Sequence, residues 1–441
     1  QEKGKRTLTY IFDVSQTKQV SKKDKFRLWK FETEHREIFQ KLSGISEFDK
    51  GKDQVVKDFS KNLNLKKYDI ELTTLGPVFI GSGYNTNKKE AIFFKNKVVL
   101  IDTKEMFEYL IRRNLLRRYQ EYMLDSNKDL AAFLKENNIG SEVYEKWKSK
   151  TIPLLDTEDT SQGGTKQKGI DRFVRDGRGL VYVPGSSLKG MFRTILTAAY
   201  LIKNKEYAKK TGDKLELAVR QLGQSTKPGD WEKALGKAMG EIDTEIFHKN
   251  LFSNPECKMG NKVNDSLRGF MVSDSEYIAD EDMCICQKLD FSLSAREVAL
   301  PLYRECIKPN VKIRFSITID SSFCKYSIED ILEAIEIFSA DYKNKFTSNF
   351  TKAPKLNNKY ICYLGGGAGF VSKTIIYPSF EKTKAVKFTA KWLSIKFNKV
   401  GHDRDTQVSP RMIKCTRFNN TVYQFGACCL SKYSEDSLKS Y

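Results

Sequence analysis

Segments that resemble half-buried strands alternate with segments that resemble helices along most of this chain. Residues 69–75 (DIELTTL) alternate apolar and polar side chains, as expected of a strand with one buried face. Asp102 then precedes a helical pattern, with Glu105 at the spacing of a capping box. Long apolar runs of the parallel-sheet kind are missing, so the alternation predicts an α+β fold. The helix that follows Asp102 is expected to reach Arg118. Its apolar side would consist of Met106, Phe107, Leu110, Ile111 and Leu115.

The length of the chain, 441 residues, exceeds what one hydrophobic core usually spans, so we expect two domains. Residues 1–66 form a charged N-terminal extension of unknown role. The first domain would cover residues 67–299, with a helical insertion over about 203–263, and the second would cover 300–441. The polar stretch 155–169 is expected to be a binding loop or a tolerated insertion.

The charge balance favours a polyanionic partner. Lys and Arg number 76 against 56 Asp and Glu, which gives a formal net charge of +20. Because neutralised phosphates release counterions, this excess indicates a nucleic acid more than an anionic membrane or a merely basic surface. We expect no membrane partner, because no run of about 18 apolar residues exists. Nine scattered cysteines without a C-x-x-C pair argue against structural zinc and fit a reducing cytoplasm.

The first candidate binding motif is the stretch 183–194 (VPGSSLKGMFRT). A serine following Pro-Gly is expected to cap a helix, and helix N-termini present free amides and a partial positive charge that suit phosphate. Ser186 and Ser187 would lie at this end, and Lys189 and Arg193 would add cations at i,i+4 spacing. The alternative is an ordinary capped helix with two solvated cations. The buried stripe is expected to contain Leu188, Phe192, Ile195 and Leu196.

The second candidate motif is a glycine-rich stretch that contains Gly365, Gly366, Gly367, Ala368 and Gly369, with Lys373 shortly after it. Each glycine in a regular element would forfeit about 0.5–1 kcal/mol, so the stretch predicts a loop whose amides can approach a ligand closely. It lacks the Gly-Lys-Ser/Thr ending of a Walker loop and the context of a dinucleotide fingerprint. A flexible or tight turn is the alternative.

Two further motifs are less specific. Arg172 and Arg175 flank Phe173, and single-strand binders combine cations with stacking aromatic rings in this way. A half-buried helix edge would explain the same pattern. Residues 300–305 (LPLYRE) are expected to join the two domains, and packing is the only role that can be derived for them.

Catalysis finds little support in the sequence. His35, His248 and His402 are the only histidines, all in polar or charged surroundings, and they are expected at the surface. No hydrolase, zinc-protease or kinase signature appears. Residues 403–405 (DRD) could hold a metal, but a solvated loop is favoured. We therefore expect no catalytic residues, no metal site and no cofactor.

Together these motifs resemble the repeat-associated mysterious proteins (RAMPs) of CRISPR systems. That resemblance is carried by residues 76–83 (GPVFIGSG), 184–190 (PGSSLKG) and 365–369. Within the superfamily, a second set of motifs resembles the capping, fifth subunit of the type III-A Csm complex. It comprises residues 272–275 (VSDS), 300–305 and 363–373. The match covers roughly residue 68 to the C-terminus.

The resemblance implies two RRM-like (ferredoxin-like) domains and a cytoplasmic protein that binds the 3′ side of a CRISPR guide RNA. Its partners would be the guide RNA and the backbone RAMP subunits of the Csm complex. It would also support guide maturation, by positioning or recruiting nucleases that trim the 3′ end. The amides around Ser186, Ser187 and the loop 365–369, with Lys189 and Arg193, would hold the RNA backbone.

Target slicing and two rival functions are weighed against this one. Target-slicing backbone subunits carry an Asp in the loop after their first strand, and residues 81–93 (GSGYNTNKKEAIF) contain none. A RAMP endoribonuclease that processes CRISPR repeat RNA would use a histidine near its first domain, but His35 lies outside the recognisable part. A structural scaffold whose charge only serves solubility is the second rival.

Overall fold

The computed structural model describes residues 64–94, 96–126, 128–155, 169–223, 225–248, 262–399 and 401–436. Residues 1–63 of the expected N-terminal extension (1–66), residues 156–168 of the expected loop (155–169) and residues 249–261 of the expected insertion lie outside these ranges. The described residues belong to one compact unit. No helix within them is long and apolar enough to cross a membrane.

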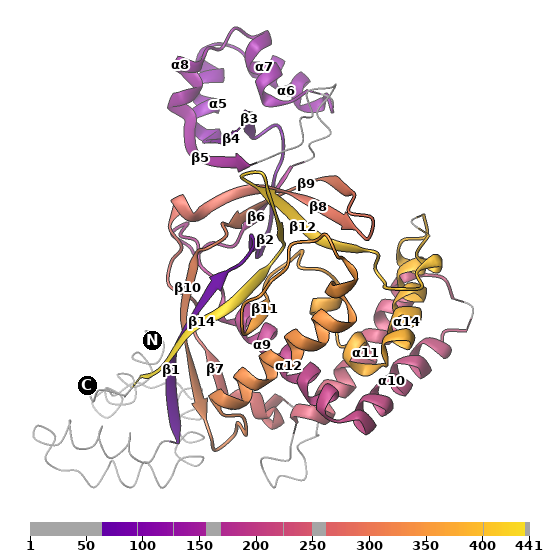
Figure 1. Cartoon of the computed structure of the whole chain (residues 1–441). Helices are drawn as coiled ribbons and strands as arrows, with labels where there is room; N and C mark the ends of the chain where they lie inside the picture. The colour runs from indigo at the N-terminus through magenta and orange to yellow at the C-terminus, as the bar shows by residue number, and fades with distance from the viewer. Residues whose placement is uncertain are drawn as a thin grey trace, which may run out of the picture. The chain divides into compact units, whose positions relative to one another are not determined.

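One sheet has the strand order of the RRM-like (ferredoxin-like) fold. Its elements follow the chain order β1 (Leu65–Thr74), α9 (Gly185–Lys203), β7 (Phe270–Val272), β10 (Lys312–Asp320), α12 (Ile328–Lys345) and β14 (Ala427–Asp436). Each neighbouring pair of strands is antiparallel (Figure 1). The strands lie in the order β11 (Ile361–Tyr363), β14 (Ala427–Asp436), β1 (Leu65–Thr74), β10 (Lys312–Asp320) and β7 (Phe270–Val272).

Two helices cover this sheet through aromatic contacts. Helix α9 (Gly185–Lys203) places Phe192 edge-on to Phe270 of β7, with ring centroids 5.7 Å apart. Helix α12 (Ile328–Lys345) begins at Ser327, which caps it, and brings Tyr342 to 4.8 Å from the ring of Tyr363. Buried aromatic pairs add about 0.5–1.5 kcal/mol beyond their burial, so they fix the helices on the sheet.

The second sheet contains nine strands among the described residues. Its main path runs β2 (Gly81–Thr86), β6 (Ile170–Phe173), β9 (Glu297–Ile307), β8 (Met283–Ser292), β5 (Lys148–Leu155), β4 (Lys97–Ile101) and β3 (Ala91–Phe93). β12 (Met412–Phe418) pairs with both β8 and β13 (Thr421–Gln424). The two sheets and their helices confirm the predicted α+β class with RRM-like architecture.

The expected domain boundary at residue 300 lies inside β9. The first sheet also pairs β1 with β10 and β14, so strands from both sides of this position share one sheet. Pro301 lies where the β8–β9 register shifts, between the pairs Gln287–Tyr303 and Leu289–Ala299. Such an irregularity is a position where a strand accepts proline.

The expected long helix from Asp102 to Arg118 is interrupted. Asp102 does cap α5 (Thr103–Arg112), since its side chain accepts from the amides of Lys104 and Glu105. The prediction of one continuous helix is wrong because Asn114 adopts a left-handed conformation (φ 54°), which asparagine tolerates better than most residues. Phe107 and Ile111, expected on the apolar side, are exposed. The following helices are α6 (Leu116–Leu124), α7 (Leu130–Glu136) and α8 (Ser141–Tyr144), which share a separate apolar cluster with α5 (Figure 1).

The expected insertion is helical in its described part, as α10 (Lys205–Arg220) and α11 (Pro228–Phe247). It packs on the C-terminal part of the chain, where α13 (Ile376–Ser379) and α14 (Lys382–Lys396) lie. Trp231 of α11 stacks on Trp392 of α14, with an interplanar angle of 11°. This contact ties the insertion into the main core.

Candidate nucleic-acid interface

Three segments that are far apart in the sequence meet around one cavity of about 290 Å³. Ile80 and Gly81, at the start of β2, form one wall. One side of α9 forms the second wall. Gly365 and Gly366 of the glycine-rich loop, with Lys373 after it, form the third. The cavity therefore collects residues of the three motifs that the sequence singled out.

The α9 wall follows from helical periodicity. Ser187, Gly190, Met191, Thr194 and Ile195 recur at i, i+3, i+4, i+7 and i+8, so they form one stripe that lines the cavity. Gly190 is exposed, and a Cβ built on it would meet no atom within 4 Å. Small residues thus leave room beside the helix. The predicted buried stripe is confirmed, since its four residues are at most 3% exposed: Leu188, Phe192, Ile195 and Leu196.

The N-terminus of α9 is capped by a carboxylate and not by a serine. The helix begins at Gly185, whose amide donates to Oδ1 of Asp274 at 2.7 Å. The predicted serine cap is therefore wrong, because Asp274 supplies the acceptor that the partial positive charge of the helix end favours. Ser186 stays exposed, and the amide of Ser187 donates to the carbonyl of Pro184 at 2.9 Å.

Lys189 and Arg193 lie outside the cavity stripe and contact protein groups. The Nζ of Lys189 donates to the carbonyl of Leu267 at 2.7 Å, and burial lowers the pKa of this lysine. Arg193 binds both carboxylate oxygens of Asp243, at 2.7 and 2.6 Å, and Oδ2 of Asp265 at 2.7 Å. These cations fasten α9 to α11 and to the segment before β7. Neither of them lines the cavity, although the sequence suggested that both would contact phosphate.

We expect Arg193→Ala to lower the free energy of unfolding by about 2 kcal/mol, because it strips two half-buried carboxylates of charge-assisted hydrogen bonds. The matched control is Lys203→Ala at the end of the same helix, where the ion pair with Glu333 is exposed. That change should cost less than about 1 kcal/mol. Denaturant unfolding followed by circular dichroism measures both variants. Equal values for the two would contradict a fastening role for Arg193.

The glycine-rich loop is a defined tight turn. Gly365, Gly367 and Gly369 adopt positive φ angles of 77°, 90° and 102°, which glycine tolerates. The amide of Gly366 donates to the carbonyl of Phe79 at 2.7 Å, and a Cβ on Gly365 would come within 2.1 Å of the same oxygen. Glycine therefore lets this loop lie directly against the segment that leads into β2. Within the loop Ala368 is buried, and its carbonyl accepts from the hydroxyl of Ser372 at 2.9 Å.

Lys373 supplies a cation to the cavity. The residue is exposed as a whole, but its Nζ donates to the carbonyl of Tyr363 at 2.6 Å in a partly buried contact. Loss of water around this ammonium group lowers its pKa to about 8. No carboxylate of the described residues forms an ion pair with it. The cavity wall thus presents a positive charge that the protein leaves without a countercharge.

Comparison with known families explains why these motifs occur together. The family described as the RAMP superfamily matches residues 71–372, about two thirds of the chain. The chain belongs to the RAMP superfamily. The resemblance predicted from the motifs is confirmed at this level.

Curated relatives of this RAMP protein carry the name CRISPR system Cms protein Csm5, in agreement with the capping-subunit motifs. The chain is 28% identical over 318 residues to the protein of Streptococcus thermophilus, covering 70% of the chain and 80% of that relative. It is 25% identical over 401 residues to the protein of Mycobacterium tuberculosis, covering 84% and 98%. It is 26% identical over 403 residues to the protein of Enterococcus italicus, covering 83% and 97%.

Solved structures share the fold of this RAMP protein. One chain belongs to the cryo-EM structure of a Csm-crRNA-target RNA ternary complex of a type III-A CRISPR-Cas system. It superimposes with a TM-score of 0.56 at 16% identity, covering 82% of this chain and all of that one. The crystal structure of T. onnurineus Csm5 gives a TM-score of 0.52 at 14% identity, with the same coverage.

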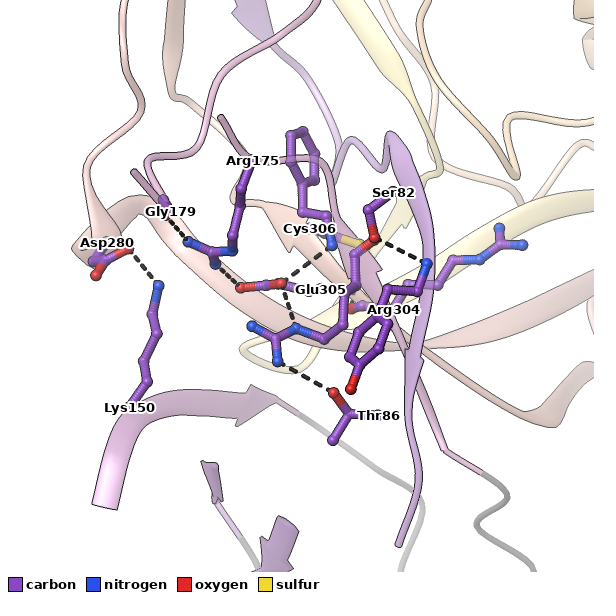
Figure 2. A network of polar contacts seen from close by, with 12 residues as sticks. Ser82, Thr86, Lys150, Arg175, Gly179, Asp280, Arg304, Glu305 and Cys306 are labelled. Carbon is purple, nitrogen blue, oxygen red and sulfur yellow. Dashed lines mark hydrogen bonds and ion pairs between the residues drawn. The ribbon is translucent and has the colours of Figure 1, made fainter. Parts of the chain in front are cut away.

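Arg172 and Arg175 of this RAMP protein bind one buried carboxylate. Figure 2 shows the contact of Arg175 with Glu305. Glu305 is completely buried and accepts from Nε of Arg172 at 2.9 Å and from the guanidinium of Arg175. The amide of Phe173 donates to the same carboxylate at 3.1 Å. Phe173 is 1% exposed, so its ring is not available to stack on a base as proposed from the sequence. The segment is strand β6 and not a helix edge.

The two described histidines of this RAMP protein are buried, contrary to the expected surface positions. His248 is 8% exposed and His402 is 7% exposed, while His35 lies outside the described residues. Nδ1 of His402 lies 2.9 Å from Oδ2 of Asp405, which also accepts from the hydroxyl of Ser409 at 2.7 Å. The expected solvated loop at 403–405 is therefore partly buried. Neither histidine lines the cavity.

Proposed function

We propose that this chain is a non-catalytic subunit of a type III-A CRISPR interference complex that binds the guide RNA, caps its 3′ side and supports guide maturation. The observation that carries the proposal is the cavity that joins the RAMP motifs and contains the unneutralised ammonium group of Lys373. The relatives named Csm5 and the fold shared with a chain of a Csm-crRNA complex support it. Its partners would be the guide RNA, the backbone RAMP subunits and trimming nucleases, in the cytoplasm.

The cavity suits a phosphate of the RNA backbone. The hydroxyl of Ser187 would donate from the wall formed by α9. Exposed Ser186 does not line the cavity and would contact the strand outside it. The loop 365–369 would admit the backbone closely where side chains are missing. Lys373 would supply the countercharge. Phosphate contacts carry no sequence information, which fits a guide whose sequence varies. Lys189, Arg193, Arg172 and Arg175 would act indirectly in this proposal, by holding α9 and β6 in place.

We expect the affinity for single-stranded guide RNA to fall roughly 10-fold or more between about 50 mM and about 300 mM salt. A fall of this size corresponds to about two neutralised phosphates of a single strand. Fluorescence anisotropy with a labelled RNA measures it. An affinity that is the same at both salt concentrations would contradict recognition of the RNA backbone and favour the scaffold rival.

The alternative function is a RAMP endoribonuclease that processes CRISPR repeat RNA. Such an enzyme needs a general acid–base group beside the RNA, and neither described histidine lines the cavity. Incubation of the purified chain with repeat RNA, with and without a divalent metal, decides between the two. Cleavage that persists through further purification would favour the endoribonuclease.

A further inference from the structure

A second group of cations lies on the other sheet, beside the glycine-rich loop. Lys288 of β8, Arg304 of β9 and Lys414 of β12 belong to three neighbouring strands. Arg304 is paired with Cys286, and Lys414 is paired with Asp290. Cross-strand partners share one face of a sheet, as do residues two apart on a strand. Lys288, between Cys286 and Asp290, therefore shares this face with Arg304 and Lys414.

The acidic residues near this group do not neutralise all three cations. Asp290 binds Nζ of Lys414 through both oxygens at 2.8 Å, and Asp171 lies 3.4 Å from Nε of Arg304. Lys288 has no ion-pair or hydrogen-bond partner among the residues that the structure describes. Burial, with the positive charges of Lys414 and Arg304, lowers the pKa of half-buried Lys288 to about 8. An unpaired lysine beside two other cations is unfavourable in the free protein.

The group borders the side of the glycine-rich loop that does not line the cavity. A Cβ built on Gly367 would lie 2.2 Å from Nη1 of Arg304, and one on Gly369 would lie 3.6 Å from Cγ of Lys414. The guanidinium of Arg304 is held over the ring of Phe79, 4.8 Å from its centroid. Its Nη1 atom is buried and has no acceptor among the described residues.

We propose that Lys288, Arg304 and Lys414 form a second phosphate-binding site, for a backbone phosphate of the RNA strand whose neighbouring phosphate occupies the cavity. The glycine-rich loop lies between the two sites, so a strand crossing the loop would meet cations on both sides. A phosphate here would supply the acceptor that Lys288 lacks and relieve the repulsion among the three cations. This inference rests on the proposed function and adds the residues that would contact the strand beyond the cavity.

The test compares Lys288→Met with Lys237→Met, a matched control at an exposed position of α11. With the same labelled RNA, Lys288→Met should bind about 5-fold more weakly at low salt. Its slope of log affinity against log salt should be smaller by about 0.7, the value for one phosphate of a single strand. Its melting temperature should rise, because methionine keeps the apolar stem and removes the repelled charge. Lys237→Met should match the wild type in all three measurements.

A wild-type affinity and slope for Lys288→Met, with steep salt dependence in the wild-type protein, would overturn the second site and leave the proposed function intact. A wild-type protein without salt-dependent RNA binding would instead overturn the proposed function. A lower melting temperature for Lys288→Met would show that the lysine is structural. In that case Lys288→Arg decides, because arginine keeps the positive charge. If the site binds phosphate, this variant must keep the wild-type slope of log affinity against log salt, and a smaller slope would overturn the second site.

Discussion

Replacing Glu305 with glutamine is expected to lower the free energy of unfolding by about 3 kcal/mol, because it leaves two largely buried guanidinium groups without their carboxylate. Burial alone would raise the pKa of Glu305, but the charges of Arg172 and Arg175 and the hydrogen bonds to the carboxylate lower it below its ordinary value. The carboxylate therefore stabilises the folded state above the pKa of an unfolded glutamate, roughly 4.3. That contribution is lost as the pH falls through the lower folded-state value.

Glu297→Gln is the matched control, because Glu297 lies on the same strand and its ion pair with Arg417 is more exposed. It should cost no more than about 1 kcal/mol. Urea unfolding at pH 7 measures both variants, and a series toward pH 3 should show the gap between wild type and Glu305→Gln closing. A gap that stays constant with pH would contradict the assigned charge on Glu305.

Replacing Gly366 with leucine is expected to weaken RNA binding about 10- to 100-fold, because one or two charge-assisted contacts of about 1.5 kcal/mol each would be blocked at the cavity wall. The fold should tolerate the change. Gly366 is exposed and does not have a positive φ, and its Cβ would come no closer than 3.3 Å to Phe79. Gly367 is unsuitable for this test, since its φ is positive and a Cβ there would displace Arg304.

The control for Gly366→Leu is Gly236→Leu, at an exposed glycine of α11 with no atom within 4 Å of its Cβ. RNA affinity is measured by anisotropy and stability by thermal unfolding. In a complex reconstituted with its partner subunits, Gly366→Leu should also reduce the share of mature guide 3′ ends, while the backbone filament still assembles. Wild-type affinity and guide lengths would show that the loop is only a structural turn.

The sequence could predict the features of the site that depend on local structure. The glycine-rich stretch was expected to be a loop, and three of its glycines adopt the backbone angles that glycine tolerates. The buried stripe of α9 follows from helical periodicity alone. The cap of the same helix was not predictable, because Asp274 is 89 residues away from Gly185.

Distance along the chain also explains why the sequence suggested phosphate contacts for cations that bind carboxylates of the protein. Arg193 looked available for phosphate because its carboxylate partners, Asp243 and Asp265, lie 50 and 72 residues further on. Arg172 is likewise 133 residues from Glu305. Lys288 and Lys414 were not singled out, since only the pairing of β8 with β9 and β12 brings them to Arg304. The sequence contains one signal for this group of cations. Arg304 and Glu305 are adjacent charged residues in the otherwise apolar motif 300–305.

The position of β1 affects how the chain can fold during synthesis. This early strand pairs with β10 and with β14, which leave the ribosome more than two hundred and more than three hundred residues later. Contacts so distant in sequence form slowly, because a long loop must close first. The first sheet therefore stays incomplete until β14 has been synthesised. Until then, both edges of β1 lack their partner strands and expose unpaired backbone groups, which are open to pairing with other chains.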